Sequence, residues 1–148
     1  IDDESLLWIG SNGSGINYFD PTTNKFSSPF DSQTKLNGTS ITQNDVLDIT
    51  QDNDGLIWIG TLRGLNSFDK KKKEFTNYYK EDGLIHNFIN ALYFDKEFNK
   101  LWIATTKGVS CFDKSTNKFT NYVAEEGKES ISNNYARGLI RLILLPEK

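Results

Sequence analysis

Short apolar segments centred on tryptophan occur three times along the chain, and each is followed by polar residues and glycine. The tryptophans are Trp8, Trp58 and Trp102, which lie 50 and 44 residues apart. A period of this size is typical of proteins built from stacked structural repeats rather than around one central core. The pattern therefore predicts three modules that pack against their neighbours, with the three tryptophans in equivalent buried positions.

Each tryptophan segment begins a predicted β-hairpin. A short glycine-bearing turn follows it, at residues 11–15, 61–64 and 105–108. The next apolar stretch ends in Phe-Asp, at residues 19–20, 68–69 and 112–113. Two apolar strands around a glycine turn are the sequence signal of a hairpin.

A further strand follows each hairpin. Residues 75–78 and 119–122 both have the sequence Phe-Thr-Asn-Tyr, whose alternation of aromatic and small polar side chains has the period of a half-buried strand. The segments before these strands, such as 69–74 and 113–118, begin with aspartate. Aspartate bonds to its own backbone in tight turns, so these segments predict turns between the two strands.

One more strand precedes Trp58 and Trp102, at residues 46–50 and 89–94, and a strand aligned with these two is expected at 136–144. Each module should therefore hold four strands, with the tryptophan strand second. The second strand at 56–59 is almost entirely apolar, so it must be covered on both faces. A radial array provides this cover, and no window shows the sustained periodicity of a helix. We therefore predict an all-β fold, a β-propeller of four-stranded antiparallel blades.

The chain should form one partial propeller over residues 1–148, with three blades' worth of strands. The repeats span about 1–43, 44–86 and 87–133, followed by a last strand at 134–145. Closed propellers need about four to eight blades. We therefore expect either further blades of a longer chain or self-association, most simply a six-bladed dimer, to complete the ring. The absence of methionine favours a mature or excised piece.

Composition and charge narrow the function. The 148 residues are 36% hydrophobic, which is enough for a real core, and the net charge is −3. An acidic chain argues against nucleic acid as a partner. No apolar stretch reaches the roughly 20 residues that cross a bilayer, so we expect no membrane contact by this segment. The lysines at 70–73 are interpreted as a solvated turn.

Metal and redox sites are not expected, and neither is a cofactor. Cys111 is the only cysteine and His86 the only histidine, so an intrachain disulfide and a His-rich metal site are both excluded. The sequence Asp-Asn-Asp-Gly at 52–55 is similar to part of a calcium loop. Placing Gly55 at the sixth loop position puts Thr61 where a bidentate glutamate is needed, so a β-turn is the better interpretation.

A glycosidase-like propeller is the least favoured alternative, and we assign no catalytic residue. Residues 50–58 resemble the Asp-box of sialidase-like propellers, with one residue too many. Those enzymes use an arginine cluster, whereas this chain has only Arg63, Arg137 and Arg141. The carboxylate pairs at 81–82 and 125–126 lie in polar loops without an apolar wall that would raise one pKa.

Residues 52–69 carry the resemblance to a known family. Their pattern Asp-x-x-Gly-Leu-Ile-Trp-Ile-Gly-Thr-x-x-Gly-Leu-x-x-Phe-Asp resembles the two-component regulator propeller repeat. The third unit departs from it at Ala104 and Val109, and the first has one extra residue between Gly10 and Gly15. The resemblance implies the periplasmic sensor region of a hybrid histidine kinase, as in Bacteroides-type bacteria. Such propellers bind polysaccharide breakdown products, so it implies an oligosaccharide ligand and no enzyme activity in this segment.

A ligand site is expected on one face, where the turns between second and third strands meet the loops that enter each first strand. The candidate residues are Asn12, Arg63 and Lys107 from the turns, and Tyr79, His86, Asn87, Asn134 and Tyr135 from the loops. An anionic sugar would suit Arg63 and Lys107. The plainer interpretation is that these are solvated loop residues or caps. A protein-interaction scaffold remains the alternative function.

Overall fold

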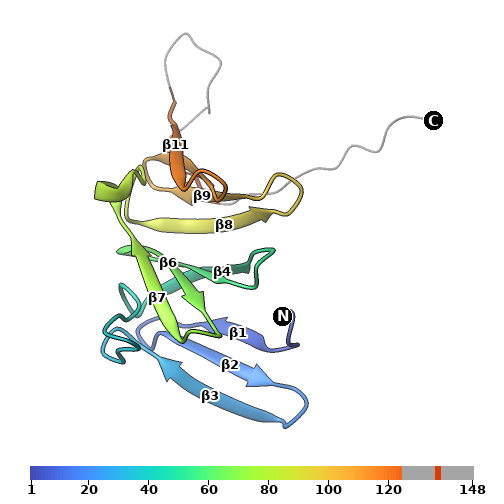
Figure 1. Ribbon diagram of the computed structural model, residues 1–148. Helices are drawn as coiled ribbons and strands as arrows, with labels where there is room; N and C mark the ends of the chain where they lie inside the picture. The colour runs from blue at the N-terminus through green and yellow to red at the C-terminus, as the bar shows by residue number, and fades with distance from the viewer. Residues whose placement is uncertain (125–135, 138–148) are drawn as a thin grey trace, which may run out of the picture.

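The computed structural model describes residues 1–124 and 136–137 and is built of three antiparallel sheets, here called blades 1, 2 and 3 (Figure 1). Blade 1 consists of β1 (Leu7–Gly10), β2 (Ile16–Asp20) and β3 (Lys25–Phe30). Blade 2 consists of β4 (Val46–Gln51), β5 (Ile57–Thr61), β6 (Gly64–Asp69) and β7 (Glu74–Tyr78). Blade 3 consists of β8 (Ile89–Asp95), β9 (Lys100–Thr105), β10 (Gly108–Asp113) and β11 (Lys118–Tyr122). A short 3-10 helix, η1 (Lys80–Asp82), lies between β7 and β8.

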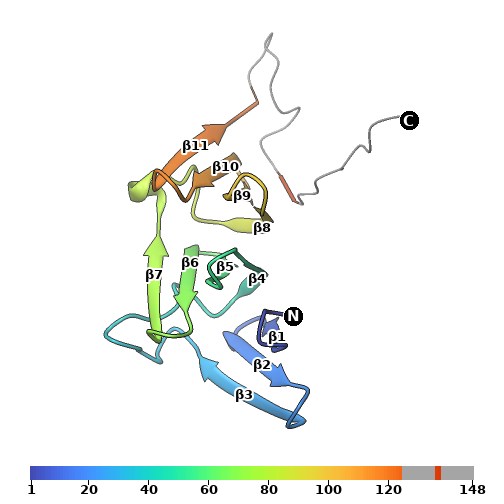
Figure 2. The same cartoon turned by 45° about the vertical axis from the view of Figure 1, so that its right-hand side comes forward.

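The blades stack face to face in chain order, with β1, β4 and β8 along one side and β3, β7 and β11 along the other (Figure 2). Within each blade, strands follow one another in sequence order, as a chain of hairpins produces. The register repeats as well, because each tryptophan lies opposite the same position of the third strand: Trp8 opposite Tyr18, Trp58 opposite Ser67 and Trp102 opposite Cys111. The predicted all-β propeller fold is confirmed.

Two hydrophobic clusters hold the blades together. The cluster between blades 1 and 2 comprises Ile16, Ile41, Val46, Ile57, Ile59, Phe68 and Phe75. The cluster between blades 2 and 3 comprises Trp58, Leu65, Leu84, Ile89, Leu92, Phe94, Leu101, Ile103 and Phe112. Every residue of β5 is buried, because β5 lies between two other blades. The prediction that this apolar strand is covered on both faces is confirmed.

The glycine after the tryptophan segment has a packing role. A Cβ built on Gly60 would lie 2.6 Å from Ile89 Cγ2, and one on Gly10 would lie 2.5 Å from Val46 Cγ1. Real Cβ atoms do not approach other carbons so closely. Glycine at this position therefore lets the first strand of the next blade pack directly against the second strand of the blade before it.

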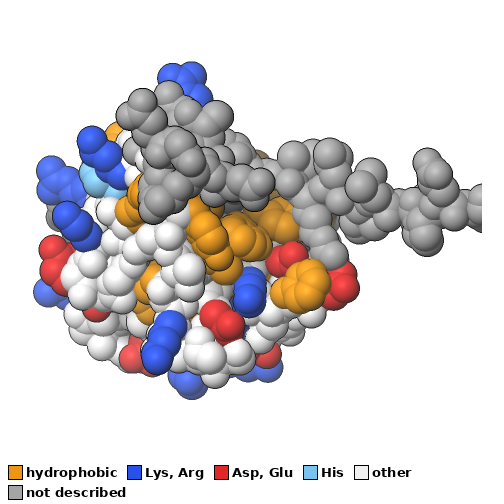
Figure 3. Space-filling model, turned by 90° about the horizontal axis from the view of Figure 1, so that it is seen from above, with side chains coloured by type: hydrophobic (Ala, Val, Ile, Leu, Met, Phe, Trp, Pro, Cys, Tyr) orange, Lys and Arg blue, Asp and Glu red, His pale blue; other side chains and the backbone are white. Residues whose placement is uncertain are grey.

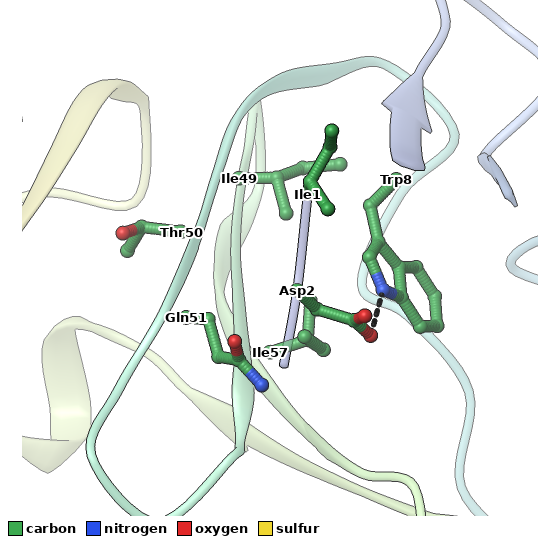
Figure 4. Close-up of a pocket in the computed structure, with 7 residues that line it drawn as sticks. All are labelled: Ile1, Asp2, Trp8, Ile49, Thr50, Gln51 and Ile57. Carbon is green, nitrogen blue, oxygen red and sulfur yellow. Dashed lines mark hydrogen bonds between the residues drawn. The ribbon is translucent and has the colours of Figure 1, made fainter. Parts of the chain in front are cut away.

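The expectation that all three tryptophans are equally buried is wrong. Trp58 is 1% exposed, whereas Trp8 and Trp102 are half-buried. Blade 3 has no described blade beyond it to cover Trp102. Trp8 lies on β1, which is an edge strand of blade 1. Beside Trp8 is a pocket of about 250 Å³, which residues of β4 also line (Figure 4). Ile1, Ile49, Thr50, Gln51 and Ile57 also line this pocket, together with Asp2.

The turns between third and fourth strands have the predicted chemistry. Asp20, Asp69 and Asp113 each accept a hydrogen bond from the backbone N–H two residues later, at 2.8, 2.9 and 2.9 Å. The last turn residue has a positive φ in each case: Asn24 (55°), Lys73 (54°) and Asn117 (56°). Asparagine tolerates this left-handed conformation better than lysine does.

The last predicted strand, at 134–145, lies outside the described residues except for Ala136 and Arg137. The completion of the ring by further blades or further copies stays a prediction. In the described ranges, no helix combines the length and hydropathy that crossing a membrane requires.

Candidate functional site

The turns and entry loops meet on one face, as predicted from the sequence. Between the β1–β2 turn and the loop that enters β4, Val46 N–H donates to Ser11 O and Gly15 N–H donates to Asn44 O, both at 3.0 Å. In the third blade, Thr106 Oγ1 lies 2.9 Å from His86 Nδ1. We call this surface, made of the turns after β1, β5 and β9 and the loops before β4 and β8, the loop face.

Arg63 and Lys107 occupy matching positions on the loop face. Each N–H donates to the hydroxyl of the threonine that begins its turn, Thr61 or Thr105, at 3.1 Å. The same hydroxyls donate to the carbonyl of the glycine that ends the turn. The backbone of both turns is therefore fixed, while the two cationic side chains, like Asn12 in blade 1, are exposed.

His86 is half-buried and lies within a basic environment. Burial lowers the pKa of His86, and the positive charges of Lys107 and Lys80 lower it further. The histidine, pale blue in Figure 3, lies among Lys and Arg side chains. Its Nδ1 accepts a hydrogen bond from Phe88 N–H at 3.1 Å, which fits the neutral imidazole. The loop face therefore gathers Lys80, Lys107 and His86, of which sequence reasoning missed Lys80.

Two of the predicted ligand residues support the loop itself. Asn87 Oδ1 accepts from Lys80 N–H at 2.7 Å, and Tyr79 N–H donates to Asp82 Oδ2 at 2.8 Å. Both bonds hold η1, which presents Lys80. Asn134 and Tyr135 lie outside the described residues. The ligand-binding role of all these residues stays a prediction.

A repeated carboxylate site connects neighbouring blades at the opposite end of the strands. Asp52 is 5% exposed, and its Oδ1 accepts from Asp54 N–H (2.9 Å) and Leu56 N–H (3.0 Å). Its Oδ2 accepts from the indole N–H of Trp58 at 2.8 Å and from Lys114 of blade 3. This explains the Asp-Asn-Asp-Gly sequence without calcium. No group of three or more potential ligand side chains (His, Cys, Asp or Glu) that could hold a metal occurs in the described part of the chain.

Asp2 makes the same set of contacts one blade earlier. It accepts from Trp8 Nε1 at 2.7 Å (Figure 4). It also accepts from Glu4 N–H, Leu6 N–H and Lys70 Nζ, each at 2.9 Å. We call each such set of aspartate, tryptophan and next-blade lysine a blade clamp.

The interpretation of the lysines at 70–73 as a wholly solvated turn is therefore wrong for Lys70. Its side chain is 13% exposed and also contacts Asp3 at 2.7 Å and Glu4 at 3.2 Å. Lys71, Lys72 and Lys73 are exposed, as expected. Lys70 and Lys114 differ from the other turn lysines because each follows Phe-Asp directly and reaches back to the preceding blade.

The first clamp predicts acid sensitivity. Burial acts to raise the pKa of Asp2, but the bonds from Trp8 and Lys70 outweigh it and lower this pKa; the bond from Lys70 holds the pKa of Asp3 at about 2. A carboxyl group whose pKa is lower in the folded state than in the unfolded state stabilises the fold at pH values above its unfolded-state pKa. This stabilisation is lost as the pH falls through the folded-state pKa. We expect the urea midpoint, followed by tryptophan fluorescence, to fall between about pH 4 and pH 2. A constant midpoint over this range would contradict the clamp.

The sequence and the fold agree with known propeller proteins. Residues 40–63 match a family model described as two component regulator propeller. The match confirms that this segment resembles the two-component regulator propeller repeat. The match covers the loop into β4, β4 itself, the Asp52 turn, β5 and the turn with Arg63. No curated protein matches the chain.

Solved structures of other proteins share the propeller fold of this chain. The chain is 25% identical, with a TM-score of 0.74, to the extracellular domain of BT3049 from B. thetaiotaomicron, assigned as a hybrid two component system. The alignment covers 91% of this chain and 17% of that one. PorZ of Porphyromonas gingivalis, a surface component of the type-IX secretion system, shares the fold at 14% identity and a TM-score of 0.51, over 90% of this chain and 28% of PorZ. This chain thus resembles part of the extracellular domain of a hybrid two component system.

Proposed function

We propose that this chain is a non-catalytic segment of a periplasmic sensor propeller, part of a hybrid two-component histidine kinase, and that it binds an acidic oligosaccharide on its loop face. The observation that carries the proposal is the similarity to the extracellular domain of a hybrid two component system over 91% of the chain. Because that domain is much longer, the signalling output belongs to parts beyond this segment.

The charges of the loop face support an anionic ligand. Arg63 and Lys107 project from rigid turns at matching positions of neighbouring blades. Lys80 belongs to η1, and its charge, like that of Lys107, lowers the pKa of His86. Cations on preorganised backbone attract carboxylates at little entropic cost. A sugar acid lying across two blades would contact both turns.

The carboxyl groups support binding rather than hydrolysis. A glycosidase needs one carboxyl group with a raised pKa beside an ionised one. Every described carboxyl group whose pKa departs from its ordinary value has a lowered pKa. In Asp20 and Asp113, for example, hydroxyl and backbone donors that bond to the carboxylate lower the pKa. Asp82, which the sequence places beside Glu81, is used to cap Tyr79.

Replacing both Arg63 and Lys107 by alanine should weaken binding of an oligogalacturonide by about tenfold or more, because two charge-assisted contacts are lost. The free energy of unfolding should change by less than about 0.5 kcal/mol, since exposed loop charges contribute little to stability. Isothermal titration calorimetry and urea unfolding measure the two effects. The Lys71→Ala/Lys118→Ala variant removes the same charge elsewhere and should bind normally. Full binding by the first variant, or turnover of the sugar, would refute the proposal.

A further inference from the structure

A second pocket lies between blades 1 and 2, away from the loop face. Its volume is about 370 Å³, within the range of small-molecule sites. The aromatic side chains that line it are Trp8, Tyr18, Phe30 and Phe68, and the other lining residues are Glu4, Leu6, Leu36, Lys70 and Lys73. We call it the junction pocket. It is bounded at one end by the first blade clamp, which supplies Trp8 and Lys70.

The residues that distinguish this junction from the next one line the pocket. Tyr18 lies opposite Trp8, where blades 2 and 3 place the small side chains of Ser67 and Cys111 opposite their tryptophans. Leu36 belongs to a loop of 15 residues between β3 and β4, whereas the loop between β7 and β8 has 10. Packing one blade against the next does not require a tyrosine at position 18 or the longer loop, because the junction between blades 2 and 3 forms without them.

Lys73 departs from the repeat at a conformational cost. The equivalent residues of the other turns are Asn24 and Asn117, and all three have φ near +55°. Asparagine is several-fold enriched in this left-handed region, and lysine is not. The long loop nevertheless fixes this turn, because Asn37 Nδ2 donates to Lys72 O at 3.0 Å and to Lys73 O at 3.4 Å. A constrained turn that keeps an unfavourable lysine indicates a use for its ammonium group.

The polar groups of the pocket are available to a ligand. Lys70 is held by three carboxylates, including Glu4 at 3.2 Å. By contrast, the Tyr18 hydroxyl and the Lys73 ammonium have no hydrogen-bond or ion-pair partner within residues 1–124 and 136–137. The pocket therefore combines aromatic walls with one free hydroxyl and one free cation.

We propose that the junction pocket binds a small ring compound that carries a carboxylate. The ring would lie against Trp8 and Tyr18, whose large, rigid surfaces bind at low entropic cost, and the carboxylate would pair with Lys73. Both a sugar acid and an aromatic acid offer this chemistry. The inference is independent of the oligosaccharide site proposed on the loop face.

Titration of the isotope-labelled chain tests the pocket through its three indole N–H signals in the ¹H–¹⁵N spectrum, assigned with Trp→Phe variants. Sodium glucuronate and sodium 4-hydroxybenzoate are the two probes, and methyl glucoside is the neutral control. At least one carboxylate should shift the Trp8 signal saturably, while the buried Trp58 signal stays unchanged and methyl glucoside has no effect. The responding probe identifies the source as a sugar acid or an aromatic acid. No saturable Trp8 shift with either probe would overturn the proposal.

Two variants replace a pocket residue with the one that another blade has at the equivalent position, so both should fold. Lys73→Asn should weaken the responding probe by about tenfold, and Tyr18→Ser should weaken it as well. Lys71→Asn removes a charge from the same turn but not from the pocket, and should bind as the unaltered chain does. Equal affinity of Lys73→Asn and Lys71→Asn would overturn the assignment. The Arg63→Ala/Lys107→Ala variant should keep the Trp8 response, which separates this site from the loop face.

Discussion

Replacing Asp52 by alanine should lower the free energy of unfolding by about 3–5 kcal/mol, because it leaves a buried set of donors without their acceptor. The carboxylate is 5% exposed and accepts from two backbone N–H groups, the Trp58 indole and Lys114. Without it, Lys114, whose side chain is only 10% exposed, keeps the exposed Asp54 as its carboxylate partner among the described residues. Urea unfolding followed by tryptophan fluorescence gives the change by linear extrapolation.

Asp54→Ala is the matched control for this prediction. Asp54 lies 2.7 Å from the same Lys114 ammonium, but its side chain is 71% exposed. An exposed ion pair contributes less than about 1 kcal/mol, so the loss should be small. Equal losses for the two variants would show that the clamp is a surface ion pair and not a buried network.

Trp58→Ala should cost about 3–5 kcal/mol, the range for removing a large side chain from a packed core. The ring packs against Tyr78 and Phe112, with centroids 5.6 and 5.5 Å away, and its N–H bonds to Asp52. Trp8→Ala removes the same side chain and the same type of N–H bond from a half-buried position, so it should cost clearly less. Equilibrium unfolding of both variants, read by circular dichroism, compares them directly. A loss for Trp8 as large as for Trp58 would contradict the burial difference.

Much of the fold could be predicted because the determinants are local. The β4 strand, expected at 46–50, is observed as Val46–Gln51, and β8, expected at 89–94, is observed as Ile89–Asp95. The turn aspartates act within three residues of themselves. The prediction of equal tryptophan burial failed, because the exposure of Trp8 and Trp102 depends on which neighbouring blades cover them and not on the similar apolar sequence around them.

The clamps were missed because their members are far apart in sequence. Asp52 and Lys114 are separated by 62 positions, and in the sequence each belongs to an ordinary polar turn. A signal was present nonetheless: an aspartate six residues before tryptophan at Asp2 and Asp52, and a lysine directly after Phe-Asp in the following blade. Lys80 was missed for a similar reason. It belongs to a 3-10 helix that no sequence periodicity indicated, and the fold brings its charge, with that of Lys107, close to His86.

The clamp also bears on how such chains can lengthen. Blade 2 contributes Asp52 and Trp58 to the junction after it, and Lys70 to the junction before it. A duplicated copy of such a blade would carry both the aspartate–tryptophan pair and the lysine of a blade clamp. Each new junction could therefore form a complete clamp without further substitutions. Blade 1 has Pro21 in place of the lysine, so it supplies a clamp only to the junction after it. Duplication of blade 2 should therefore be tolerated more readily than duplication of blade 1.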